Sequence, residues 1–234
     1  MEKRAISIEA AFKFAWQRFQ TNAGIWIVLA IPTVLFEMVH GLISKSNPFH
    51  PSIGIPLVIL CLIILLAQVI GTYWGLRALN QENVPLGMLD DVWRFVPASI
   101  VGYLVMMALL ISAFAPIWGS IFLIPQLEPA MVNWVVLGGI LLCFIVLPVV
   151  LYFCVKLWLF NYLILDKDLG AFASMAESAR VTKGYRGTLF LYFIIGAILN
   201  IPSRFTMGLS QFITYPLITL AGVNLYRQIV PRGE

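Results

Sequence analysis

The chain has 234 residues, of which 61% are hydrophobic and only 11% are charged, and its mean hydropathy is +0.92. Soluble globular domains are roughly 45–50% apolar and about a quarter charged, so this composition excludes an ordinary soluble domain and indicates a membrane protein. The formal net charge is +4, and no basic stripe suited to nucleic acid accompanies it. Nucleic acid is therefore not expected as a partner.

Residues 1–23 carry four basic and two acidic residues and have no uninterrupted apolar core, so they differ from a cleavable signal peptide. Phe14 and Phe19 recur at a spacing that allows them to face lipid or the rest of the protein, while Lys13 and Arg18 can face water. The pattern predicts an amphipathic helix at the membrane surface.

Six apolar segments follow that are long enough to cross a bilayer, since about 20 apolar residues span a hydrocarbon core of roughly 30 Å. They comprise residues 24–43, 53–78, 98–124, 132–157, 188–205 and 209–226. The predicted fold class is all-α: a polytopic membrane bundle of six transmembrane helices with amphipathic helices at the interface. Apolar sequence continues past the fourth segment to Leu165, and Pro148 offers a break within this long run.

The basic residues are distributed unevenly between the two sides of this topology. Of the 15 Lys and Arg residues, Lys45 and Arg204 fall on one side, and the other thirteen (15 − 2) fall on the opposite side. Because cytoplasmic segments of membrane proteins are enriched in Lys and Arg, both termini are predicted to lie in the cytoplasm.

The second, fourth and sixth segments each end on aromatic residues beside a cation, which is typical of a helix anchored at the membrane interface. These three interfacial cations are Arg77, Lys156 and Arg227. A short amphipathic stretch also precedes each odd-numbered segment. We therefore expect one integral membrane domain built as a threefold repeat, each unit a surface helix followed by a two-span hairpin, with units near residues 5–84, 85–167 and 168–234.

Residues 169–183 are much less apolar than their surroundings and predict an interfacial docking helix. Small residues recur there every four positions and would form one stripe on the helix. The stripe consists of Gly170, Ser174, Ser178 and Thr182. Small side chains allow close approach to another backbone, so the helix is expected to dock under the bundle, with Phe172 on its apolar face.

Polar residues at both ends of this helix are interpreted as caps and pairs. Asp166 or Asp168 is expected to cap the N-terminus, and Gly184 to close the C-terminus. Glu177 is expected to pair with Arg180 one turn later.

The same segment resembles a known family. The matching residues are Asp166-Lys167, Phe172-Ala173-Ser174-Met175, Ser178, Arg180 and Thr182. In these residues the chain resembles the YciC-type bacterial inner-membrane proteins and, more loosely, is similar to the membrane domain that accompanies some glycerophosphodiester phosphodiesterases. The resemblance implies a multi-pass protein of the bacterial inner (plasma) membrane. It supplies no catalytic or ligand-binding residue, because the phosphodiesterase chemistry belongs to a separate soluble domain.

Four polar residues fall within the predicted spans, where ionisable groups are costly and point to function. They are Glu37, His40, Asn200 and Arg204. One hypothesis is that Glu37 and Arg204 pair and line a polar pocket on the outer side. The alternative is that both side chains extend to the outer interface.

Neither catalysis nor metal binding is indicated by any motif. The carboxylates at Asp90 and Asp91, like those at Asp166 and Asp168, suit helix caps better than a cation site, and the two His residues lack zinc-type spacing. No nucleophile and base can be paired. We therefore expect no metal, no cofactor and no enzymatic activity.

These features favour a lipid- or amphiphile-associated membrane protein, acting in binding or transport, with membrane lipids as its partners. The alternative is a scaffold or assembly factor whose surface helices dock a partner protein or a second copy of the chain. A membrane-embedded lipid hydrolase or transferase is the least supported hypothesis.

Overall fold

The computed structural model describes residues 6–43, 51–79, 86–123 and 129–231, and every element within them is helical. The elements are α1 (Ile8–Thr21), α2 (Ala23–Ile43), α3 (Pro51–Ala78), the 3-10 helix η1 (Leu86–Phe95), α4 (Val96–Leu123), α5 (Pro129–Leu157), α6 (Phe160–Lys167), α7 (Ala171–Val181), α8 (Arg186–Phe205) and α9 (Gln211–Ile229). The all-α class is confirmed, and each of the six predicted apolar segments forms a helix.

Fewer than six of these helices qualify as membrane spans. Among the described residues, four helical stretches are long and apolar enough to cross a bilayer. They lie in α3, in η1 with α4, in α5 with α6, and in α8. A fifth exists if α1 and α2, which meet at a bend of 104°, are taken as one broken span. The protein therefore has the helices of a multi-pass membrane protein, but six spans are not confirmed. The helix α9 is not among the candidates, because polar residues such as Thr214, Thr219, Asn224 and Arg227 make it too little apolar.

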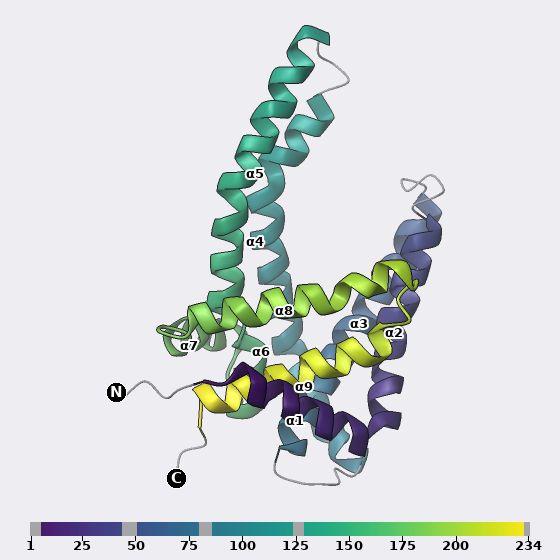
Figure 1. Cartoon of the computed structure of the whole chain (residues 1–234), viewed down its shortest axis with the longest axis vertical. Coiled ribbons are helices and arrows are strands. Elements are labelled where there is room, and N and C mark those ends of the chain that lie inside the picture. Colours follow the sequence, from purple (N-terminus) through teal and green to yellow (C-terminus); the bar gives the residue numbers. More distant parts are fainter. Residues whose placement is uncertain (1–5, 44–50, 80–85, 124–128, 232–234) are drawn as a thin grey trace.

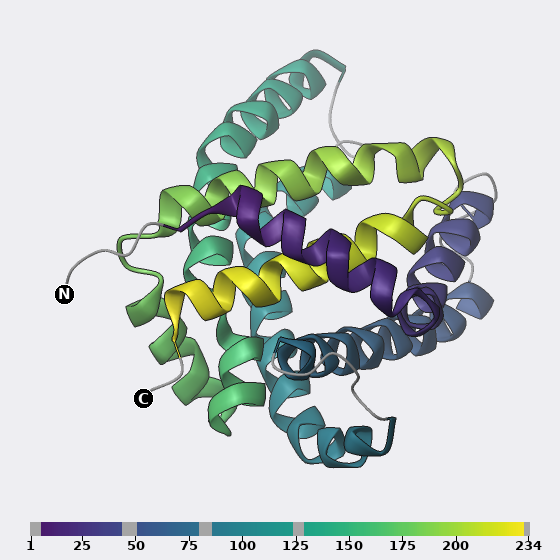
Figure 2. The same ribbon diagram turned by 60° about the horizontal axis from the view of Figure 1, so that its bottom comes forward.

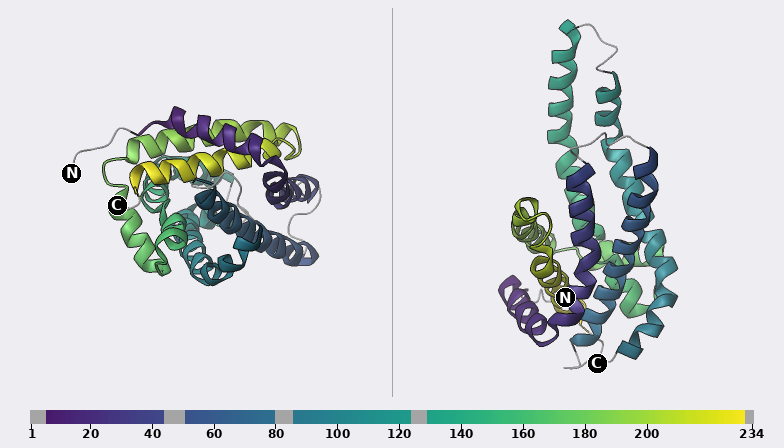
Figure 3. Two further views of the ribbon diagram at one scale, coloured as in Figure 1. Left: turned by 90° about the horizontal axis from the view of Figure 1, so that it is seen from below. Right: turned by 90° about the vertical axis from the view of Figure 1, so that its right-hand side faces the viewer.

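The three predicted hairpins do not share a direction. In Figure 1 the α4–α5 hairpin stands upright and the α2–α3 hairpin rises beside it, whereas α8 and α9 run across both. Figure 2 and the right-hand view in Figure 3 show the same crosswise placement from other sides. A threefold repeat of equivalent hairpins is therefore not confirmed. The helices repeat along the chain, but the third pair packs differently from the first two.

The helix α9 lies at the centre of the packed base. Its residues Leu220, Ala221, Val223 and Tyr226 are fully buried, between two apolar clusters. One cluster joins α9 to α3, η1 and α6, and the other joins it to α1, α2 and α3. The two clusters make α9 the helix around which the rest of the base packs.

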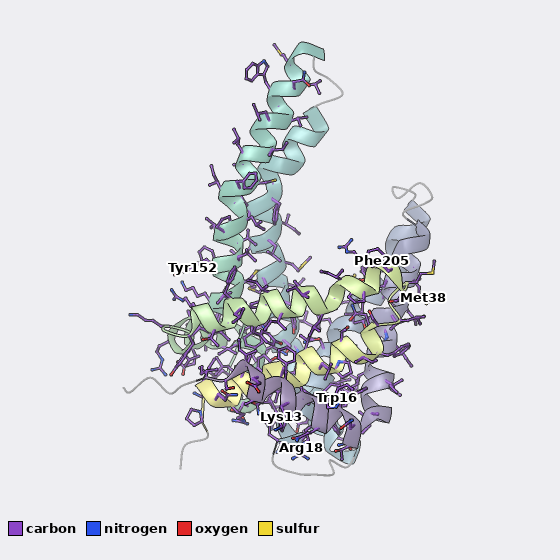
Figure 4. All side chains as sticks on the ribbon, viewed as in Figure 1. Lys13, Trp16, Arg18, Met38, Tyr152 and Phe205 are labelled. Atoms are coloured by element: carbon purple, nitrogen blue, oxygen red, sulfur yellow. The ribbon has the colours of Figure 1, made fainter. Side chains whose placement is uncertain are left out.

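The N-terminal amphipathic helix α1 lies along α9. Its small residues Ala11 and Ala15 are fully buried, which lets the two backbones approach closely. Ser7 N donates to Gln228 Oε1 at 2.8 Å, and Gln228 Nε2 donates back to Ser7 O at 3.2 Å. Lys13, Trp16 and Arg18 point away from α8, toward the lower edge of Figure 4. The surface helix is therefore an integral part of the base.

The long apolar run toward Leu165 breaks between α5 and α6, after Leu157, whereas Pro148 lies within α5. The break is stabilised by α7. Ser178 Oγ donates to Lys156 O at 3.0 Å and accepts from Leu159 N at 3.1 Å. Thr182 Oγ1 also donates to Lys156 O, at 3.2 Å. Side chains from a neighbouring helix thus satisfy backbone groups that an interrupted helix leaves free.

Candidate functional site

An apolar groove with one cationic end lies between α5 and the first turns of α8. Its volume is about 430 Å³. Its walls include Pro148, Leu151 and Tyr152 of α5 and Arg186, Gly187 and Phe190 of α8. Pockets that hold small ligands are commonly roughly 300–1,000 Å³ and are lined mainly by apolar side chains with a few polar groups. The groove meets this description.

The polar end of the groove is a fixed guanidinium group. Arg186 Nη1 donates to Tyr152 OH at 2.9 Å, and the guanidinium carbon lies 4.8 Å from the centre of the Tyr152 ring. Arg186 Nε is buried and has no hydrogen-bond partner among the described residues. Stacking on an aromatic ring holds an arginine in one orientation, and the Nη hydrogens that Tyr152 does not use remain as donors for a phosphate or carboxylate. The arrangement is suited to an anionic group at the end of an apolar chain.

The local sequence explains why space remains beside Arg186. Gly184 has a φ of +98°, a backbone conformation that L side chains rarely adopt, and it turns the chain from α7 into α8. Gly187 follows Arg186, and a Cβ at this position would meet no atom within 4 Å. The missing side chain therefore leaves the groove open at the point where the cation enters it.

A second hollow, of about 210 Å³, lies on another side of α5, against α4. Its lining includes Met106, Leu110, Ala113, Val149 and Phe153, which are all apolar. It offers room for a hydrocarbon chain but no partner for a charged head group. Of these two hollows, the α5–α8 groove is the one with chemical selectivity.

A polar cluster at the base brings together residues that were predicted as separate features. Arg227 donates from both Nη atoms to the Asp166 carboxylate, and Tyr226 OH donates to Asp166 Oδ2 at 2.7 Å. Asp166 and Arg227, together with Tyr73 and Arg77, line a hollow of about 90 Å³. Asp166 therefore does not cap α7, which begins after Gly170 without a side-chain cap. The cluster joins α6 to α9: Asp166 pairs with Arg227, and Arg77 Nη2 donates to Tyr73 OH at 3.1 Å.

The three predicted interfacial cations thus separate into two groups. Arg77 and Arg227 line the same polar hollow, whereas Lys156 lies apart, with Nζ 5.5 Å from the centre of the Phe153 ring. The Lys156 backbone carbonyl accepts the hydrogen bonds from α7 described above. Arg227 lies beside Arg77 because α9 runs across the base and is not a third upright helix.

The structure does not pair Glu37 with Arg204. No ion pair joins the two residues in the part of the chain that the structure describes, and Arg204 is exposed. Glu37 packs instead against the α8–α9 turn, where a Cβ on Gly208 would lie 2.8 Å from Glu37 Cβ. Asn200 is structural: it donates to Gly196 O at 2.8 Å and accepts from Gln211 Nε2 at 2.9 Å. The side chain of His40 lies outside the described residues.

The docking helix α7 presents its small residues to the protein interior. Ser174, Ser178 and Thr182 are fully buried, whereas Gly170 is exposed at the N-cap. Phe172, expected on the apolar face, is 69% exposed. Glu177 and Arg180 form the expected pair, with N···O distances of 2.7 Å. The helix packs on α4, α5 and α6.

From the sequence alone, Arg186 was grouped with the other basic residues of one side, and Tyr152 was counted among the interfacial aromatic residues at the end of the fourth segment, without relating the two. Two features pointed to the groove: Arg186 sits beside Gly187, and it opens a segment with apolar residues concentrated on one face. Among the described residues, no three His, Cys, Asp or Glu side chains gather closely enough to hold a metal ion. No model of a protein family matches the chain, and no curated protein or solved structure matches it either.

Proposed function

We propose that this chain is a multi-pass protein of the bacterial inner membrane, with cytoplasmic termini, that binds a membrane lipid or related amphiphile without converting it chemically. The observation that carries the proposal is the α5–α8 groove, whose apolar walls end at the fixed guanidinium of Arg186. An acyl chain would lie along Leu151 and Phe190, and an acidic head group would accept hydrogen bonds from Arg186. Because acyl chains in the bilayer already lie in an apolar environment, selectivity for the lipid would come from the contact between its head group and Arg186.

The distribution of charge supports this location. Thirteen of the 15 basic residues, Arg186 among them, fall on the side predicted to be cytoplasmic. Anionic lipids attract basic residues at this surface by about 1 kcal/mol per Lys or Arg. A groove that opens there meets acyl chains and phosphate groups together.

Filling the groove tests the proposal. Gly187→Leu places a side chain in the open space, and Gly138→Leu is the matched control, because a Cβ at either position would meet no atom within 4 Å. Native mass spectrometry of protein purified from membranes should detect bound lipid in the parent and in Gly138→Leu, and roughly tenfold less in Gly187→Leu, because overfilling the groove costs about 1–3 kcal/mol. Equal lipid occupancy in both variants would rule out the groove as the binding site.

A scaffold function is the second candidate, and one observation favours it. Phe172 projects from α7 with 69% of its surface exposed, and the same helix also exposes Arg180. Exposed aromatic and arginine side chains on one helix are typical of a protein-binding surface. A photo-cross-linking amino acid at position 172 should then capture one defined protein, and Phe172→Ala should abolish the complex while lipid occupancy stays unchanged. Cross-links to lipid alone would contradict the scaffold.

A further inference from the structure

The helix α8 has two faces with different partners. Leu189, Tyr192, Gly196 and Ser203 recur at intervals of three, four and seven residues and are buried, with Gly196 against Ile218 of α9. The opposite face is apolar and exposed. It consists of Phe190, Leu191, Ile194, Ile198, Ile201 and Phe205. A continuous apolar stripe of this length on a helix that is already packed on one side requires a covering partner.

Each end of the stripe carries an arginine. Arg186 and Arg204 are 18 residues apart (204 − 186), which is five turns of about 3.6 residues, so both project from the same side of α8. At about 1.5 Å per residue, roughly 27 Å separate them. A helix lying flat at a membrane surface presents such cations to lipid phosphates at both ends of its apolar face.

The two ends of α8 are held by different hairpins. Its first turns pack on α5 at the groove, where Arg186 bonds Tyr152. At the other end, a Cβ on Gly208 would lie 2.8 Å from Glu37 Cβ and 3.2 Å from Val34 O, so the α8–α9 turn abuts α2. Figure 4 labels Tyr152 on α5 and Phe205 and Met38 at the opposite end, and α8 crosses the space between them. The helix therefore bridges sideways from one hairpin to the other.

We propose that α8 does not cross the membrane but lies in the plane of the cytoplasmic leaflet. Acyl chains of that leaflet cover its exposed apolar face, and Arg186 and Arg204 bind phosphate groups of phospholipids in the same leaflet. The apolar length of α8 satisfies the requirement for a span, but its direction follows from the contacts at its ends. The proposal uses the membrane location assigned above and does not depend on a ligand in the groove.

Depth measurements along α8 distinguish the two orientations. In the full chain carrying Cys61→Ala, Cys143→Ala and Cys154→Ala, single cysteines replace Leu191, Ile194, Ile198, Ile201 and Phe205, and each receives a nitroxide label. The protein is placed in phosphatidylcholine vesicles that contain phosphatidylglycerol, and depth is read from relaxation by oxygen and by a water-soluble nickel complex. An in-plane helix gives depths that agree within about one helical turn, roughly 5 Å.

The control series lies on α5, at Trp134, Leu141, Ile145 and Val149, which are exposed. Those labels should become deeper and then shallower along the helix. If α8 gives the same rising and falling profile, with a displacement of roughly 21 Å from Leu191 to Phe205, it is a span and the proposal is wrong. Water accessibility at all five α8 positions also overturns it, because acyl chains would then not cover the face.

A second measurement identifies the leaflet in which α8 lies. Cysteines at Lys183, Met207 and Met131 are labelled with a membrane-impermeant maleimide in right-side-out and inverted vesicles. Lys183 and Met207 should react from the same side, and Met131, near the far end of the α4–α5 hairpin, from the other. Reaction of Met207 together with Met131 overturns the proposal. The variant Gly187→Leu should empty the groove without changing the α8 depth profile, so failure of the lipid-binding proposal is distinguishable from failure of this one.

Discussion

Asp166 at the end of α6 and Arg227 in the last turn of α9 form a bidentate ion pair, in which both Nη atoms donate to the carboxylate. Tyr226 OH adds a third hydrogen bond to this carboxylate. Only 15% of the Asp166 side chain and 13% of the Arg227 side chain are exposed. The pair therefore fixes the central helix α9 to α6 where water has little access.

Replacing Asp166 with Asn should lower the free energy of unfolding by about 2–4 kcal/mol, because the buried guanidinium loses its counter-ion. The measurement is thermal unfolding in detergent micelles. Asp168→Asn is the matched control: this side chain is 69% exposed and lies 4.0 Å from Arg94, so its loss should cost less than about 0.5 kcal/mol. Equal effects of the two substitutions would contradict the structural role of the pair.

At the break between α5 and α6, the Leu159 N–H should depend on a single hydroxyl group, that of Ser178. Ser178→Ala leaves the buried Leu159 N–H without its acceptor and should destabilise the protein by about 1–3 kcal/mol. Hydrogen exchange should show earlier loss of protection around Leu159. Ser174 is equally buried, but its hydroxyl donates within its own helix, to Ala171 O at 2.7 Å. Ser174→Ala should therefore cost less and leave protection at Leu159 unchanged; the reverse order of effects would refute this assignment.

Lowering the pH should reduce the free energy of unfolding, in part because Glu177 becomes protonated. Hydrogen bonds from Arg180 above all, with a further one from Lys167, lower the pKa of Glu177 to about 2. A carboxylate with a lowered pKa stabilises the fold above its unfolded pKa, and this contribution disappears as the pH falls through its folded value. The stabilisation should be complete above about pH 4.5 and absent below about pH 2.

The comparison of the parent with Glu177→Gln isolates this effect from other titrations. Because Arg180 is 70% exposed, water screens the pair, and the parent should be more stable by only about 0.5–1 kcal/mol near neutral pH. Denaturant titrations at several pH values should show that the difference in free energy of unfolding between the parent and Glu177→Gln shrinks toward pH 2. When Glu177→Gln is made in a protein that already carries Arg180→Gln, its effect on the free energy of unfolding should be smaller at every pH. A difference that grows as the pH falls would contradict the predicted effect of acid.

The helices themselves could be predicted from the sequence, because a helix buried in lipid and a helix buried in protein both need a long run of apolar residues. The segment predicted at residues 24–43 is α2, Ala23–Ile43, and that at 132–157 is α5, Pro129–Leu157. The residues that cap the helices could not be predicted as well. Asp166 was an apparent cap but pairs with Arg227, 61 positions away. Local spacing carries no information about such distant competitors.

The direction of α8 and the groove could not be predicted for the same reason. The α8–α9 turn is set by the approach of Gly208 to Glu37 and by the Asn200–Gln211 hydrogen bond, neither of which appears as a periodicity. Likewise, Tyr152 meets Arg186 across 34 positions. The distribution of basic residues was interpreted on the assumption that every apolar segment of sufficient length crosses the bilayer. This assumption placed Arg204 on the outer side.

Close packing of α9 should make Gly222 intolerant of any side chain. A Cβ there would lie 2.4 Å from Tyr162 OH, 2.9 Å from Tyr192 OH and 3.1 Å from Trp158 Cζ2. These aromatic groups are held by one another, with the Trp158 ring centre 5.3 Å from that of Tyr162 and 4.9 Å from that of Tyr192. The three rings therefore have little room to move away from an added methyl group.

Gly222→Ala should consequently reduce stability by about 1–3 kcal/mol, even though alanine favours a helix over glycine by about 1 kcal/mol. Gly196→Ala is the control on the facing helix α8, where the added Cβ would meet Ile218 Cδ1 at 3.8 Å, an ordinary contact. That variant should be neutral or slightly more stable in the same thermal unfolding measurement. Because both glycines are helical and buried, helix propensity acts equally in the two variants, and the difference between them reports the packing of α9. A Gly222→Ala protein as stable as Gly196→Ala would show that α9 is not packed against Trp158, Tyr162 and Tyr192 as closely as described.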